Sequence, residues 1–253
     1  MEETTETTTT NPKQGGGTRI IIAAILLIAI GIGGYIYLSK DKNSSTGEDT
    51  ATSTADIVLG TDRESGPVAQ VNGAEVSRKE YEDSVVNIAE NAKAQGADIT
   101  DPAVQEQIKE QALTTLINTK LLAQAATASG VSITDTEIQT EFDGIVAQFG
   151  STEALQAQLA SYNISEEALR SDLKEQLTIQ AYLETAVDTS TITVTDEEIT
   201  AFYDSLDNSQ GTLPELETIR DQVEAEIRTQ KEQVLIAELL DTLREQATIE
   251  KFV

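Results

Sequence analysis

Hydrophobic and polar residues are distributed very unevenly along the chain. Residues 20–38 form an uninterrupted run without a charged side chain, IIIAAILLIAIGIGGYIYL. At about 1.5 Å per helical residue such a run spans roughly 30 Å, the thickness of the hydrocarbon core of a bilayer. The run is longer than the apolar core of a signal peptide, and no small-x-small cleavage pattern follows it before the next lysine. The pattern therefore predicts a retained transmembrane anchor.

The segments on either side of this anchor are polar. Residues 1–19 are rich in Thr, Glu and Gly, which predicts a disordered tail. Residues 39–66 are rich in Ser, Thr, Asp and Gly, interrupted only by Ile57-Val58-Leu59, and we interpret them as a flexible linker. Basic residues flank both ends of the anchor, so the positive-inside rule gives almost no indication of its orientation in the membrane. Because the preceding tail is short and polar, we expect the large C-terminal part to lie outside the cytoplasm.

Residues 67–253 have the periodicity of one mainly helical domain. Apolar residues recur at helical spacing, as in Val104, Ile108, Ala112 and Leu116, in Leu169, Leu173 and Leu177, and along a long final helix opened by Pro214. Capping boxes predict three helix starts, at Ser77/Glu80, Thr134/Glu137 and Thr195/Glu198, and Asp101-Pro102 predicts a fourth. The fold class is therefore mainly α.

Two short segments have strand character. Val68–Val71 is followed by Asn72-Gly73, and residues 74–76 return, which is typical of a hairpin with a tight turn. Residues 248–253 alternate like a strand at the end of the chain. Because an isolated strand is not stable, we expect this segment to pair with Val68–Val71 and to join the two ends of the domain.

The repeated T-D-x-E segments at Thr134 and Thr195 have two interpretations. Their carboxylates resemble a metal-binding cluster, but each segment stands directly before an apolar helical run. Capping of the helix and favourable interaction with its dipole explain that position better.

Composition narrows the chemistry further. The formal net charge is −27, and such an acidic surface repels nucleic-acid backbones. The chain has no His, Cys or Trp, which removes Ser-His-Asp and Cys-His catalysis, zinc sites with N or S ligands, and disulfides. The sequence contains no phosphate-binding glycine loop outside the anchor, and nothing in it indicates a cofactor.

The order of these segments resembles that of the SurA-like and PrsA-like extracytoplasmic chaperones. The resemblance is carried by VAQVNGAEVS (68–77), ALTTLINTKLL (112–122), GVSITDTEI (130–138), the segment from Phe149-Gly150-Ser151 to Leu159, YNISEEALR (162–170), VTDEEI (194–199) with Phe202-Tyr203, and the final helix around residues 230–243. It implies a helical SurA N-terminal-like chaperone lobe over residues 67–253, with a small strand pair joining its ends, preceded by one transmembrane helix.

The chain departs from this family pattern at one point. Only ten residues separate Tyr203 from Pro214, where relatives with isomerase activity carry a parvulin-type domain of about a hundred residues. Parvulin sites also commonly use histidines, and this chain has none. We therefore do not expect prolyl isomerase activity or any other enzymatic activity.

The resemblance implies an ATP-independent holdase, anchored in the membrane through Ile20–Leu38, that binds unfolded or partly folded exported polypeptides. The predicted client-binding residues are the aromatic side chains Phe142, Phe149, Tyr162, Phe202 and Tyr203. One small-xxx-small spacing in the anchor, Ala29 and Gly33, is compatible with a homodimer. Two alternatives stay open: an acidic helical scaffold for one dedicated envelope partner, and a hydrolase that uses two carboxylates.

Overall fold

The computed structural model describes residues 53–60, 65–161, 164–206 and 214–253. Within these ranges the fold is mainly helical with one small sheet, which confirms the predicted fold class for the domain. The predicted tail, the predicted anchor at residues 20–38 and most of the predicted linker lie outside the described residues. No helix in the described ranges is both long enough and apolar enough to cross a membrane.

The sheet joins the two ends of the domain, as the sequence predicts. It contains β1 (Ala69–Val71), β2 (Ala74–Val76) and β3 (Ile249–Lys251), in the order β2-β1-β3 with antiparallel pairing throughout. Val71 lies opposite both Ala74 and Ile249. Asn72 and Gly73 have φ angles of 51° and 82°, and two positive φ angles are what a tight two-residue hairpin turn requires.

The predicted capping motifs all begin helices. The helices concerned are α4 (Arg78–Ala94), α5 (Pro102–Ala128), α6 (Asp135–Phe149) and α9 (Asp196–Ser205). Before α4, the Ser77 hydroxyl accepts from the Glu80 amide at 3.2 Å, and the Ser77 amide donates to the Glu80 carboxylate at 2.8 Å. The same reciprocal pairs form before α6 and α9, so both T-D-x-E segments are caps. Asp101 caps α5.

The remaining helices complete the fold. They are α7 (Thr152–Ser161), α8 (Glu166–Ala186), a short 3₁₀ turn η2 (Thr189–Thr191) and the long α10 (Leu216–Gln246). Pro214 stands two residues before α10, whose N-cap is Glu215. At about 1.5 Å per residue α10 is roughly 46 Å long, and it is the longest helix among the described elements.

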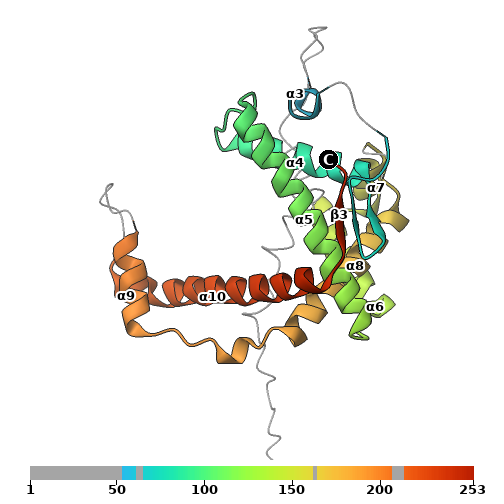
Figure 1. Ribbon diagram of the computed structural model, residues 1–253. Coiled ribbons are helices and arrows are strands. Elements are labelled where there is room, and N and C mark those ends of the chain that lie inside the picture. Colours follow the sequence, from blue (N-terminus) through green and yellow to red (C-terminus); the bar gives the residue numbers. More distant parts are fainter. Residues whose placement is uncertain (1–52, 61–64, 162–163, 207–213) are drawn as a thin grey trace, which may run out of the picture.

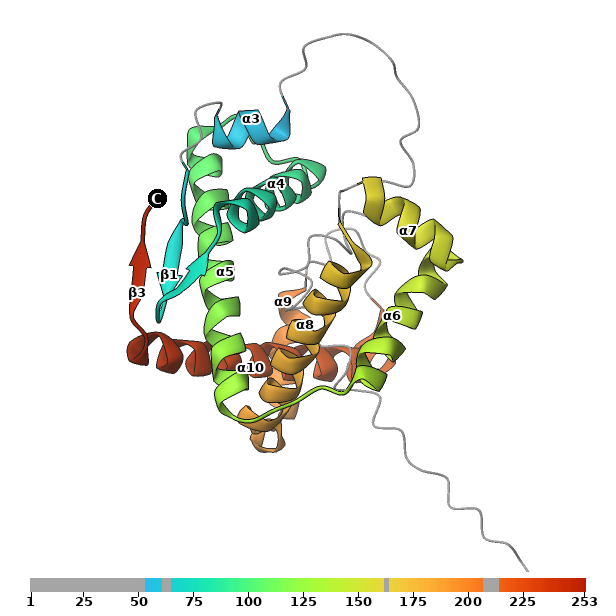
Figure 2. The ribbon, with the colours of Figure 1, turned by 90° about the vertical axis from the view of Figure 1, so that its right-hand side faces the viewer.

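Several hydrophobic clusters divide the domain into a body and two projections. The body consists of the sheet, α4 and α5, and it continues into a second cluster where α5, the end of α8 and α10 meet. A helical lobe, formed by α6, α7 and the first half of α8, has its own core. An arm, formed by α9 and the first half of α10, has another. Figures 1 and 2 show α5 and α10 crossing where these parts join.

One short helix falls inside the range that the sequence predicts to be a flexible linker. Residues Thr54–Leu59 form α3, with Ser53 as N-cap. Val58 is 1% exposed and belongs to the core of the body, and the Gln105 side-chain amide donates to the Ile57 carbonyl at 3.0 Å. The linker prediction is therefore wrong for residues 53–60, because the apolar triplet at 57–59 finds a complementary surface on α4 and α5.

Candidate functional site

The first of the predicted client-binding residues, Phe142, is a core residue of the helical lobe. It is 3% exposed and packs with Ile138, Leu155 and Leu169. The guanidinium carbon of Arg170 lies 3.9 Å from the centre of its ring, a cation–π arrangement. Arg170 in turn donates to Glu166 at 2.9 Å. A client cannot reach this ring without opening the lobe, so Phe142 does not form part of an exposed surface in this structure.

Phe149 lies at the edge of the same lobe. It is the last residue of α6 and is partly buried against the α6–α8 core. Gly150, which follows it, has a φ of 84° and ends the helix in the left-handed conformation. One side of the Phe149 ring therefore remains accessible. Tyr162 lies outside the described residues.

Phe202 and Tyr203 lie on α9, in the arm. Phe202 is partly buried against Ile199, Val223 and neighbouring apolar residues, and the Tyr203 hydroxyl donates to the Pro214 carbonyl at 2.8 Å. The pair therefore presents two half-buried aromatic rings near the tip of the arm.

The attachment of α9 to α10 is partly ionic. The Lys231 ammonium lies 2.6 Å from the Glu198 carboxylate and donates to the Thr193 carbonyl at 2.6 Å. The hydrogen bond from Lys231 holds the pKa of Glu198 below its usual range. Arg228 also donates to the Ile192 carbonyl at 3.2 Å. These contacts attach both α9 and the segment before it to α10.

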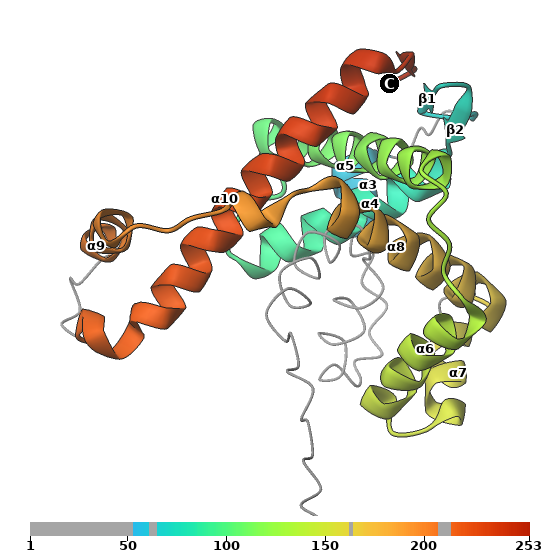
Figure 3. The ribbon, with the colours of Figure 1, turned by 90° about the horizontal axis from the view of Figure 1, so that it is seen from below.

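The structure does not bring the predicted aromatic residues into one cluster. Those of the lobe and those of the arm belong to separate hydrophobic cores. Figure 3 shows α6 and α7 at one end of the molecule and α9 at the other, with α10 running between the arm and the body. The sequence places apolar residues on helix faces, but it does not reveal how far apart those faces lie.

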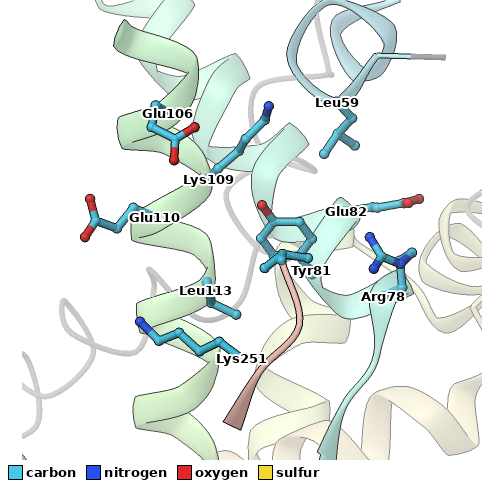
Figure 4. Close-up of a pocket in the computed structure, with 10 residues that line it drawn as sticks. Leu59, Arg78, Tyr81, Glu82, Glu106, Lys109, Glu110, Leu113 and Lys251 are labelled. Atoms are coloured by element: carbon cyan, nitrogen blue, oxygen red, sulfur yellow. The ribbon is translucent and has the colours of Figure 1, made fainter. Parts of the chain in front are cut away.

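A cavity of about 510 Å³ lies on the body, between α3, α4, α5 and the residues that follow β3. Figure 4 shows Tyr81 and Leu113 at its wall, with Glu106 and Glu110 of α5 at the rim. Burial raises the pKa of the Tyr81 hydroxyl. The cavity lining therefore mixes apolar and charged side chains, a combination that suits an amphipathic side chain.

A second cavity of about 310 Å³ lies beside β3 and is lined by Thr114, Ile117, Arg244, Ile249 and Lys251. Lys251 lines both cavities, which therefore follow one another along the end of the chain. Sequence reasoning missed both. The first needs α3, which lies in the predicted linker, and the available signal was the apolar triplet at residues 57–59.

Two acidic residues away from the cavities have a carboxyl pKa that is raised by burial. Glu232 on α10 is 5% exposed, and its burial raises the pKa of its carboxyl group. Burial likewise raises the pKa of Asp172 on α8, with further contributions from the negative charges of Glu175 and Glu80. In the described ranges, the side chains that could coordinate a metal ion do not gather into a group of three or more.

The sequence of this chain matches a known family and a curated relative. The model of the SurA-like N-terminal domain family matches residues 11–183, more than half of the chain. The foldase protein PrsA of Clostridium acetobutylicum is 26% identical over 194 residues, which cover 73% of this chain and 57% of the relative. The chain thus spans a little over half the length of this curated relative.

One solved structure is similar over much of the chain. It comes from structural work on two structurally related SurA-like chaperones of Campylobacter jejuni. It is 17% identical, with a TM-score of 0.46, and the match covers 74% of this chain and 99% of the solved one.

Proposed function

Because this chain belongs to the SurA-like N-terminal domain family, we propose that it is a membrane-anchored, ATP-independent holdase without prolyl isomerase activity. It binds unfolded exported polypeptides outside the cytoplasm and slows their aggregation. Membership of this family of extracytoplasmic chaperones is the single observation that carries the proposal. The predicted anchor at residues 20–38 supplies the membrane attachment.

The connection between α9 and α10 supports the absence of an isomerase domain in this region. The chain passes from Tyr203 to Pro214 through ten residues, and the Tyr203 hydroxyl bonds to the Pro214 carbonyl. The two ends of this connection are therefore held together directly. Ten residues are too few for a catalytic domain of the length found in isomerase-containing relatives.

Partly exposed apolar residues at the edges of the lobe and the arm supply the client contacts. Phe149 at the lobe, with Phe202 and Tyr203 at the arm, offers large contact area with few rotatable bonds. Since each ring is already half buried in its own core, each contact is small. Ordering a flexible client also offsets much of the gain from apolar burial, so the affinity is modest and release needs no nucleotide.

The experiment is an aggregation assay with the full chain in lipid nanodiscs and no nucleotide. A chemically denatured model client is diluted into buffer, and light scattering is followed at low and at high salt. We expect stoichiometric suppression that persists at high salt, because apolar contacts are not screened. Empty nanodiscs and nanodiscs carrying an unrelated acidic membrane protein are the controls. The absence of suppression refutes the holdase proposal.

Matched variants locate the surface. Phe149→Ser removes a partly exposed aromatic ring from the lobe, and Val234→Ser removes an apolar side chain that is 56% exposed on α10. We expect Phe149→Ser to weaken protection and Val234→Ser to leave it unchanged. Protection that depends on a single folded partner and disappears at high salt would instead indicate an acidic scaffold.

A further inference from the structure

In the part of the chain that the structure describes, the β3 edge of the sheet is open. In the order β2-β1-β3, β3 has a paired neighbour on one side only. Figure 2 shows β3 as the outermost strand, and none of the helices drawn there runs alongside its free edge. An open edge presents a row of main-chain donors and acceptors to which another extended chain can pair.

The register identifies which main-chain groups face outward. The amide of Asn72 donates to the Thr248 carbonyl at 2.8 Å, and the amide of Phe252 donates to the Val68 carbonyl at 2.9 Å. In an antiparallel pair these positions alternate, so Ile249 and Lys251, which lie between them, direct their N–H and C=O groups away from β1. No backbone hydrogen bond outside the sheet, among the described residues, uses those groups.

The side chains of β3 divide between two faces. Ile249 and Lys251 lie opposite Val71 and Ala69, on the face of the sheet that packs on α5. Glu250 lies opposite Gln70, which in turn lies opposite Glu75, so the outer face carries the row Glu75–Gln70–Glu250. A fourth strand beside β3 would place one residue next to Glu250, and a basic side chain is favoured there.

Both cavities border β3 and α5. The smaller one is lined by Ile249 and Ile117, and the larger one by Val253, Leu113 and Tyr81. Glu106 and Ile117 lie about 16 Å apart along the axis of α5, and this distance is close to the length of a strand of five residues. A side chain of an added strand opposite Ile249 would therefore lie beside the smaller cavity, and one opposite Lys251 would lie beside a residue that lines both.

We propose that the open edge of β3 binds a short extended segment of an unfolded client as a fourth strand. The segment carries a basic residue opposite Glu250, flanked by apolar residues opposite Ile249 and Lys251. This inference rests on the proposed function and names the class of segment that the chaperone recognises. Main-chain hydrogen bonds allow segments of many sequences to bind. The two cavities and Glu250 favour segments that carry a basic residue between apolar ones.

A second copy of this chain fits the edge less well. Antiparallel self-pairing that aligns the outward groups is centred on Ile249, Glu250 or Lys251. The register centred on Ile249 pairs Lys251 with Ala247, whose amide already donates to the Arg244 carbonyl. The other two registers place Glu250 opposite its symmetry mate, or Lys251 opposite its own. Like charges directly opposite one another destabilise a strand pair. The edge is therefore complementary to a chain of different sequence.

The test measures binding of two fluorescent peptides to the full chain in nanodiscs. Both contain the pattern Val-X-Val between flexible polar ends, with X either Lys or Glu, and the pattern presents the same residues in either strand direction. We expect the Lys peptide to bind about three- to tenfold more tightly than the Glu peptide, the range set by cross-strand charge pairs. Glu250→Lys should reverse this order.

A proline variant separates edge binding from binding elsewhere. The amide of Lys251 faces away from β1, so Lys251→Pro removes an outward donor while the bonds to β1 remain. We expect Lys251→Pro to bind the Lys peptide at least tenfold more weakly than Lys251→Ala, because both variants lack the lysine side chain and only Lys251→Ala keeps the amide. Thermal unfolding followed by circular dichroism verifies that both variants fold.

A second measurement does not depend on either substitution. Hydrogen exchange at single-residue resolution should show new protection at the amides of Ile249 and Lys251 when the Lys peptide is added. The amides of Glu250 and Phe252, which face β1, should change little.

Three results would overturn the inference: equal affinity of both peptides for wild type and Glu250→Lys, binding unaffected by Lys251→Pro, or a dimer formed through β3 in sedimentation. The aggregation assay keeps the two proposals distinct. If wild type suppresses aggregation but the peptides fail these tests, the edge inference fails and the holdase function stands. If the peptides bind as expected but aggregation is not suppressed, the holdase proposal fails and the edge inference stands.

Discussion

The side chain of Asn72 adds hydrogen bonds to the sheet that joins the two ends of the domain, and its substitution gives the sharpest test of the fold. The Asn72 side chain accepts from the Thr248 amide at 2.8 Å and donates to the Gln124 side chain at 2.8 Å. Gln124 also donates to the Val71 carbonyl at 2.8 Å. Asn72 thus joins the hairpin turn, the segment before β3 and α5.

Two substitutions separate its hydrogen bonds from its backbone conformation. Asn72→Gly removes both side-chain bonds but suits the positive φ of 51°. At roughly 0.5–1.5 kcal/mol for each hydrogen bond, it should lower the free energy of unfolding by about 1–3 kcal/mol. Asn72→Ala removes the same bonds and adds the cost of a left-handed conformation for a residue with a Cβ, roughly 1–2 kcal/mol more.

The assay is urea unfolding of the full chain in mild detergent, followed by far-ultraviolet circular dichroism. We expect the midpoints in the order wild type, Asn72→Gly, Asn72→Ala, with similar slopes. If Asn72→Gly unfolds at the same urea concentration as wild type, the network does not hold the ends together. If Asn72→Ala equals Asn72→Gly, the turn does not require its left-handed conformation.

Three further outcomes test the packing and the electrostatics. Val58→Ala removes two buried methyl groups from α3 and should destabilise the body by about 2 kcal/mol in the same urea assay, whereas no effect would mean that α3 is not part of the core. Phe142→Ala should cost about 3–5 kcal/mol and broaden the unfolding of the lobe, whereas a loss of client protection at unchanged stability would show that this ring contacts clients. Because burial raises the pKa of Glu232 in the folded state, folding takes up a proton between the unfolded and folded pKa values, and stability falls as pH rises through that window. Glu232→Gln should therefore stabilise the protein at pH 7 and lose this advantage below about pH 4.5; a constant difference at all pH values would contradict the assignment.

The parts of the fold that the sequence predicts are those fixed by local chemistry. Capping boxes at Ser77, Thr134 and Thr195 depend on residues three positions apart, and all three begin helices. The turn at Asn72-Gly73 depends on the φ angles that these two residues accept. Pairing of the terminal segment with β1 is not local, but it was predictable because an isolated strand needs a partner and β1 was the available one.

The parts that the sequence does not predict depend on distance between elements. The triplet at residues 57–59 is too short to predict a helix, and α3 is stable because Val58 fits a surface made by α4 and α5. Aromatic residues were predicted to line one binding surface because their rings give large contact area with few rotatable bonds. Tertiary packing instead buries Phe142 and separates Phe149 from the arm. Periodicity tells which side of a helix is apolar, but not whether a neighbouring helix covers it.

The course of α10 relates two of the proposed contact regions to each other, the arm and the open edge of β3. The helix begins in the arm beside α9 and ends two residues before β3, so roughly 46 Å of rigid helix separates the arm from the open edge. An extended client needs about fourteen residues to span this distance, at 3.3–3.6 Å per residue. Short segments can therefore occupy only one region at a time, whereas longer unfolded chains can engage both, and the second contact then forms at a high effective concentration. A folded chain presents no such length of extended backbone. The separation of two weak contact regions thus favours unfolded over folded polypeptides without requiring that either contact be strong.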